Sequence, residues 1–289
     1  MRYILLLVSL FFIIFANDEY ELKELKNEKT KSSMQKWLDN DLSLKPYKTN
    51  YILPYGYSSK EYQSNIPTVE YKNIEAELQV SLQLHIGSNL IGLKEKYYIS
   101  YSHQAFWQIY IDSAPFREST YNPEAFVIIP IEHKGSMISL RSFKLALAHQ
   151  SNGQPNTSEI YFDQNQSLGN LSRSVNYVYG SLRGQYNGLI VDLKAWAPLP
   201  ENKEDSDNYD LMDYWGFSSL KLTYFIDEHM FTLMGRGNIG TQRGAIKATY
   251  SYPLVHNNFY VKLFSGYGES LIDYNSKLTK LSFGFSFSR

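Results

Sequence analysis

Residues 281–287 read LSFGFSF, with a large apolar side chain at every second position. These apolar side chains alternate with serine or glycine, and alternate residues of a β-strand face opposite sides of the sheet. Such a strand has one fully apolar face and one small, polar face. The pattern is typical of a sheet that meets an apolar environment on one side only, and it favours strands as the main element of the chain.

The same alternation recurs from Thr49 to the end of the chain. We predict twelve strands, each long enough to cross a membrane at a tilt of roughly 45°, which needs about ten residues. Their expected ranges are 49–58, 73–86, 93–108, 120–131, 138–149, 172–186, 188–198, 213–226, 229–237, 243–252, 257–266 and 278–288.

The connecting segments provide an independent argument for the same fold. Connectors after the second, fourth, sixth, eighth and tenth strands are short, whereas most of the others are long loops, the ninth being the brief exception. Short turns at one end and long loops at the other are typical of outer-membrane barrels, and a soluble sandwich has no reason to sort loops in this way. The predicted fold class is all-β: a twelve-stranded antiparallel transmembrane β-barrel with a short N-terminal periplasmic segment.

The N-terminus predicts export. Arg2 precedes an apolar run at 4–15, and Ala16 offers a small residue for cleavage, so residues 1–16 resemble a secretory signal peptide. Residues 17–46 are charged, and we expect a flexible or partly helical periplasmic leader there. The barrel domain is then expected over 47–289, in the outer membrane.

Composition excludes several classes of function. The chain has no cysteine, which rules out a disulfide framework, a thiolate metal site and a cysteine nucleophile. Its formal net charge is −1, whereas nucleic-acid-binding proteins normally have a basic face, so no nucleic-acid partner is expected.

A polar constellation interrupts the apolar face of one strand. In LALAHQSNGQ, residues 145–154, His149 and Ser151 continue the parity of Leu145 and Leu147, and by parity Asn176 faces outward from the next strand. Polar groups on a lipid-facing wall are costly unless they bond to one another. A serine nucleophile, a histidine base and an amide that orients the imidazole satisfy this requirement and form a variant of the catalytic triad. The alternative is a strand that frays into a polar loop.

The chain resembles the bacterial outer-membrane phospholipase A family. The matching segments extend over most of residues 44–289 and are LKPYKTNYILPY at 44–55, APFREST at 114–120, HQSNGQ at 149–154, SRSVN at 172–176 and SGYGESLIDYN at 265–275. The resemblance implies a twelve-stranded barrel with its triad on the outer surface. It also implies that Ser151 is the nucleophile, His149 the general base and Asn176 the orienting amide.

The resemblance further implies Ca²⁺ as a cofactor and a homodimer as the active form. It assigns main-chain ligands to Ser113 and Gln154 and a hydroxyl ligand to Ser172, and oxygen donors of this kind suit Ca²⁺. The amide of Gly153, with a calcium-bound water, is expected to stabilise the oxyanion. Membrane phospholipids are the implied substrate, with a serine hydrolase of phospholipase A1/A2 type cleaving sn-1 and sn-2 acyl esters, including those of lysophospholipids.

Three features depart from the family pattern. Residues 159–168 lengthen the loop before SRSVN, and a second register would place the calcium hydroxyl at Ser158, although no asparagine then follows at the required spacing. Gln154 stands where the family usually has arginine, which a carbonyl ligand tolerates. His103 aligns with a glutamine of the family's dimer interface, so the details of pairing stay open.

Two other functions are compatible with a barrel. In a passive porin or structural barrel, the three polar residues would be incidental rim residues, and the protein would conduct ions or have no activity. A barrel protease would place its site toward water rather than lipid. The sequence leaves open the head-group and acyl-position preference, the calcium affinity, the cleavage position of the signal peptide and the physiological trigger.

Overall fold

The computed structural model of the protein describes residues 44–64, 69–133, 138–154, 170–200 and 206–289. The predicted signal peptide, the leader up to residue 43 and the lengthened part of the loop at 159–168 therefore lie outside the described residues. Among the residues that are described, no helix is long and apolar enough to cross a membrane.

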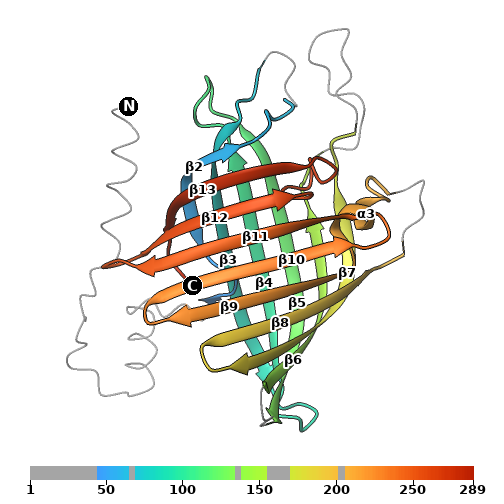
Figure 1. Ribbon diagram of the computed structural model, residues 1–289. Helices are drawn as coiled ribbons and strands as arrows, with labels where there is room; N and C mark the ends of the chain where they lie inside the picture. Colours follow the sequence, from blue (N-terminus) through green and yellow to red (C-terminus); the bar gives the residue numbers. More distant parts are fainter. Residues whose placement is uncertain (1–43, 65–68, 134–137, 155–169, 201–205) are drawn as a thin grey trace, which may run out of the picture. The chain divides into compact units, whose positions relative to one another are not determined.

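The described chain forms a single antiparallel sheet that closes on itself (Figure 1). From β2 onward each strand pairs with its neighbours in the chain, β1 pairs with β3, and the pairing of β13 with β2 closes the ring. The strands are β1 (Leu44–Pro46), β2 (Tyr51–Ser58), β3 (Ile74–Ser88), β4 (Lys96–Trp107), β5 (Phe116–His133), β6 (Ser139–Ser151), β7 (Ser174–Tyr186), β8 (Leu189–Pro198), β9 (Ser218–Ile226), β10 (His229–Asn238), β11 (Arg243–Pro253), β12 (Asn258–Gly266) and β13 (Leu278–Ser286).

The ring has twelve strand positions, as predicted. Strands β1 and β2 lie along the same edge of β3, because Leu44 pairs with Leu84 while Tyr51 pairs with Gln79 farther along that strand. They therefore occupy one position between them. The predicted fold class is confirmed, since full closure leaves no sheet edge unpaired, as a membrane-spanning sheet requires.

The two faces of the wall follow the parity of the sequence. On β13, Leu281, Phe283 and Phe285 are between 42% and 47% exposed, whereas Lys280 and Ser282 are fully buried. Large apolar side chains that are exposed on a soluble protein would form a sticky surface, but here they form the band that meets acyl chains. The polar face lines the lumen.

The lumen is filled by charged side chains that pair across it. Lys280 Nζ lies 2.7 Å from Glu75 Oε1, and Lys262 Nζ bonds both carboxylate oxygens of Glu77. Arg117 forms two hydrogen bonds to Glu75 and a further ion pair with Asp273 in the β12–β13 loop. Charges this deeply buried are stable only when they are paired. The pairs link strands that are far apart in the sequence.

One predicted strand is wrong at its start. The sequence predicts a strand over 213–226, but the structure has helix α3 (Leu211–Trp215) there, and β9 begins only at Ser218. Leu211 and Trp215 are buried, so their apolar character serves packing within the barrel unit rather than contact with lipid. The helix ends at Gly216, where φ is +72° and a Cβ atom would lie 1.8 Å from the carbonyl oxygen of Gly237. Only glycine fits at this position.

Candidate active site

The candidate catalytic residues lie on the adjacent strands β6 and β7. In the register of this pair His149 is opposite Asn176, and Ser151 is opposite Ser174. Leu145 and Leu147, which share the parity of His149, are 47% and 54% exposed, whereas Ala146 and Ala148 are buried. His149, Ser151 and Asn176 therefore belong to the outward, lipid-facing side of the wall.

His149 and Asn176 are joined by a hydrogen bond. The distance from His149 Nδ1 to Asn176 Oδ1 is 2.8 Å. An amide oxygen can only accept, so Nδ1 carries the proton and donates it, which leaves the lone pair on Nε2. This is the tautomer that a general base needs when it takes a proton from a hydroxyl group.

Each of the two strands has a further hydrogen bond at this point, one from a luminal side chain and one from the neighbouring backbone. Asn122, whose side chain faces the lumen from β5, donates from Nδ2 to the His149 carbonyl oxygen at 2.7 Å. The Asn176 carbonyl oxygen accepts from the backbone amide of Leu199 at 2.7 Å. These bonds fix the backbone on which the imidazole and the amide are mounted, so the pair depends on the lumen side of the barrel as well as on its outer wall.

Ser151 is the last residue of β6, and the chain turns immediately after it. On the other side of β6 it pairs with Tyr121, whose ring stacks on His103 with centroids 5.1 Å apart. At Gly153, φ is +63° and an added Cβ would lie 2.9 Å from Tyr121 Cε2. A glycine is needed there for both reasons, so the turn brings its backbone close to the tyrosine ring beside Ser151.

The three candidate calcium ligands lie in connectors at the same end of the barrel. Ser113 belongs to the β4–β5 connector and has a positive φ of 60°. Hydrogen bonds from Trp107 Nε1 to the Ala114 carbonyl (2.6 Å) and from the Gln108 amide to the Pro115 carbonyl (3.0 Å) hold that turn in place. Gln154 and Ser172 belong to the β6–β7 connector.

The donor chemistry of these positions suits calcium. Two carbonyl oxygens and a hydroxyl are hard oxygen donors of the kind that Ca²⁺ prefers. Within the described ranges, no group of three or more His, Cys, Asp or Glu side chains could hold a metal ion instead. A site built from main-chain and hydroxyl oxygens needs no such group.

Sequence reasoning assigned no role to Asn152, which the structure places at the centre of the β6–β7 connector. Its side chain is 2% exposed and bonds to Leu171, Arg173 and Gln154. The only signal in the sequence was its position inside HQSNGQ, between two residues that had been given roles. A buried asparagine with several backbone partners cannot be inferred from spacing alone.

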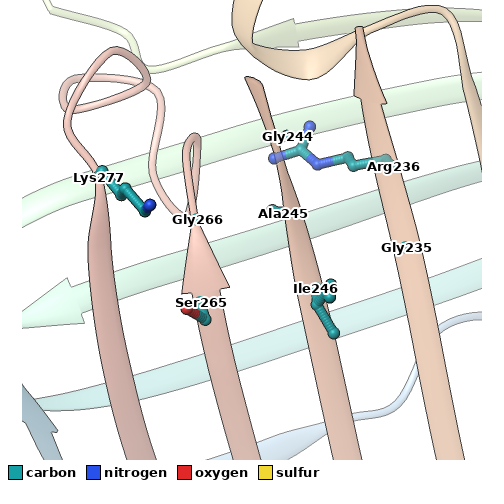
Figure 2. Close-up of a pocket in the computed structure, with 8 residues that line it drawn as sticks. All are labelled: Gly235, Arg236, Gly244, Ala245, Ile246, Ser265, Gly266 and Lys277. Atoms are coloured by element: carbon teal, nitrogen blue, oxygen red, sulfur yellow. The ribbon is translucent and has the colours of Figure 1, made fainter. Parts of the chain in front are cut away.

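A shallow hollow of about 380 Å³ lies elsewhere, on β10, β11 and β12 (Figure 2). Gly235, Gly244 and Lys277 are among the residues that line it. None of the candidate catalytic residues on β6 and β7 lines it.

These features define a class of protein. The barrel has an apolar outer wall and a polar, filled lumen, and the outer wall has a serine two residues from a histidine that is oriented by an amide. This is the architecture of a membrane-embedded hydrolase of the outer-membrane barrel type.

Comparison with known proteins agrees with this class. The family model of phospholipase A1 matches residues 26–287. Phospholipase A1 of Proteus vulgaris is 31% identical over 253 residues, which cover 85% of this chain and 82% of that protein. A putative phospholipase A1 of Neisseria meningitidis serogroup B is 30% identical over 86% of this chain and 66% of its own length. The chain therefore belongs to the phospholipase A1 family and is an outer-membrane β-barrel hydrolase.

Solved structures are similar over most of the barrel. Outer membrane phospholipase A from Escherichia coli is 28% identical with a TM-score of 0.74, and the match covers 86% of this chain and 99% of that one. The outer membrane phospholipase of Salmonella typhi, solved as a dimer with bound calcium, is 29% identical with a TM-score of 0.74, over 86% of this chain and 93% of that one. The resemblance seen in the sequence is confirmed.

Proposed function

We propose that the protein is a calcium-dependent phospholipase that cleaves sn-1 and sn-2 acyl esters of phospholipids and lysophospholipids on the outer wall of its barrel. The observation that carries the proposal is the 2.8 Å hydrogen bond from His149 Nδ1 to Asn176 Oδ1, on the lipid-facing side and two residues from Ser151. Polar side chains on an apolar wall cost free energy unless they are hydrogen-bonded, and this pair is bonded in the geometry that a general base requires.

The reaction divides into two acyl transfers. His149 Nε2 takes the proton of Ser151 as its hydroxyl oxygen attacks the ester carbonyl, and the Gly153 amide donates to the oxyanion that forms. The bond to the glycerol oxygen then breaks, and His149 returns the proton to that leaving group. Water, deprotonated by the same imidazole, hydrolyses the acyl-serine and regenerates the enzyme.

The substrate reaches the site laterally, from the membrane. Leu145 and Leu147, which precede His149 on its face of β6, are about half exposed. Val178, which lies beside them on β7, is 36% exposed. An acyl chain can lie along this apolar wall with its ester at the level of Ser151. The ion pairs that fill the lumen, Lys280–Glu75 and Lys262–Glu77, argue against a porin, whose lumen must hold water.

Calcium would be held by the carbonyl oxygens of Ser113 and Gln154 and the hydroxyl of Ser172, with waters completing its shell. When bound there it supplies positive charge and a polarised water beside the developing oxyanion. The Salmonella typhi relative, a dimer with bound calcium, supports both the ion and the homodimer as parts of the active form. Pairing of two barrels through the apolar wall near the site would make activity depend on assembly.

Labelling with a sulfonyl fluoride tests the proposal directly. We expect modification of Ser151 alone, found by mapping the modified peptide, and a rate that falls at least about tenfold when calcium is chelated, because the oxyanion is then less stabilised. Release of fatty acid from phospholipid should fall in parallel. Modification of another residue, or equal rates with and without calcium, would contradict the proposal.

Removal of the orienting amide should have a smaller effect than loss of the nucleophile. In Asn176→Ala we expect kcat to fall about 10- to 100-fold, which corresponds to one hydrogen bond to a group that becomes charged, worth ~1.5–3 kcal/mol. A related Escherichia coli structure is that of an asparagine-to-alanine active-site mutant, which supports this assignment. Full activity of Asn176→Ala in a fatty-acid release assay would show that the amide does not orient His149.

A further inference from the structure

We propose that Asn152 is a positioning residue that aligns the Gly153 amide and the two calcium ligands of the β6–β7 connector as one unit. The inference rests on the proposed function, because it concerns the groups that would stabilise the oxyanion. It is carried by the contacts of a single buried side chain, which is only 2% exposed although it lies in a connector.

Both the donor and the acceptor group of the Asn152 side-chain amide form hydrogen bonds. Nδ2 donates to the Leu171 carbonyl oxygen at 2.9 Å, and Oδ1 accepts from the backbone amide of Arg173 at 2.9 Å and from that of Gln154 at 3.3 Å. Its own backbone amide donates to the Arg173 carbonyl oxygen at 3.0 Å. Three of these bonds join the segment just after β6 to the segment just before β7, and the bond from Gln154 closes a turn within the first segment.

The bonds hold the Gly153 amide between two fixed points. On one side the Asn152 amide is bonded to Arg173, and on the other the Gln154 amide is bonded to the side chain two residues before it, as in an Asx-turn. Gly153 itself has φ of +63°, a conformation that a free glycine leaves easily. The side chain of Asn152 therefore restricts the direction in which the Gly153 amide points.

The same bonds set the separation of the two calcium ligands in this connector. Gln154 is bonded directly to the Asn152 side chain, while Ser172 lies between Leu171 and Arg173, both of which are bonded to it. The sequence that separates the two ligands is long, so chain connectivity alone leaves their distance free. The amide of Asn152 replaces that missing constraint, and it does so without being a ligand or touching the reacting atoms.

Asn152→Ala provides the test. We expect kcat to fall about 10- to 100-fold and the calcium concentration for half-maximal activity to rise about tenfold or more, while KM stays within about threefold, because the apolar wall that binds acyl chains is unchanged. Asn152→Asp keeps the acceptor for Gln154 and Arg173 but loses the donor to Leu171. It should recover part of the activity if positioning is the role.

Asn258→Ala is the matched control. Asn258 is also a side-chain donor to a backbone carbonyl, that of Ser286 at 3.1 Å, but it lies at the opposite end of the barrel. Its loss should lower the stability toward urea in micelles, with no change in the calcium midpoint. If both Asn152 variants keep the wild-type kcat and calcium midpoint, or lose activity only in proportion to the unfolded fraction, the inference is overturned.

The experiment separates this inference from the proposed function. A wild-type protein that needs no calcium, or whose Ser151 is not labelled by a sulfonyl fluoride, contradicts the proposed function itself. A wild-type protein that needs calcium and is labelled at Ser151, together with Asn152 variants that behave like Asn258→Ala, contradicts only the role of Asn152.

Discussion

Ser151→Ala is expected to lower the rate of fatty-acid release from phospholipid by at least about 10⁴-fold. Alanine removes the atom that would form the acyl-enzyme, and residues of a triad act as a unit, so the remaining groups cannot compensate. The barrel should stay folded, because Ser151 lies at the end of β6 and its loss removes a single hydroxyl from the wall. The measurement is kcat in mixed micelles with calcium present.

Ser174→Ala is the control for this experiment. Ser174 is the cross-strand partner of Ser151 on β7, and its backbone amide, which alanine retains, donates to Asn208 at 2.9 Å. Its activity should stay within about threefold of the wild type, the range expected when no interaction of the transition state is removed. Substantial hydrolysis by Ser151→Ala would show that another group is the nucleophile.

Lys280→Met is expected to destabilise the barrel by about 3–5 kcal/mol, the usual effect of leaving a buried charge without its partner. Lys280 is fully buried, with Nζ 2.7 Å from Glu75, 3.7 Å from Glu77 and 3.7 Å from Glu269. Methionine has a similar shape, so the change removes the charge and leaves the packing nearly intact. Urea unfolding in detergent micelles, followed by tryptophan fluorescence, measures the difference.

Lys221→Met tests whether burial of the lysine is the reason why Lys280→Met destabilises the barrel. The Lys221 side chain is 44% exposed, and its Nζ lies 3.8 Å from Asp192 on the neighbouring strand β8. Its loss should change the free energy of unfolding by no more than about 1 kcal/mol, as for other exposed pairs. Equal effects of the two substitutions would mean that the lumen is hydrated and that the ion pairs do not stabilise it by excluding water.

The face of the wall to which each side chain belongs could be predicted almost entirely from the sequence. Side chains of a strand alternate between the two faces, so the pattern is visible within a few consecutive residues. Leu281, Phe283 and Phe285 indicated one face and Ser282 and Ser286 the other, and the structure agrees at each position. The parity of His149, Ser151 and Asn176 followed from the same rule. The start of the strand predicted at 213 was wrong because Trp215 is apolar for a different reason: it belongs to helix α3 and is buried in a hydrophobic cluster.

The hydrogen bonds that support the candidate site could not be predicted from the sequence. Nothing in the spacing indicated that Asn122 bonds to His149 from the lumen, or that Asn152 links the two ends of the β6–β7 connector. Such bonds depend on the exact path of loops and on neighbours across the sheet. These bonds do not repeat along the chain, so no periodic pattern in the sequence predicts them.

The amino-acid sequence by itself determined a closed antiparallel barrel, the side of its wall that meets lipid and the strand face that presents a serine, a histidine and an amide. It could do so because alternation and turn length act within a few residues of one another. Only the tertiary structure decided which charged side chains pair in the lumen and which hydrogen bonds hold the connectors. Glu75 and Lys280 lie 205 positions apart, and a charge acquires its partner at that separation only when the ring has closed.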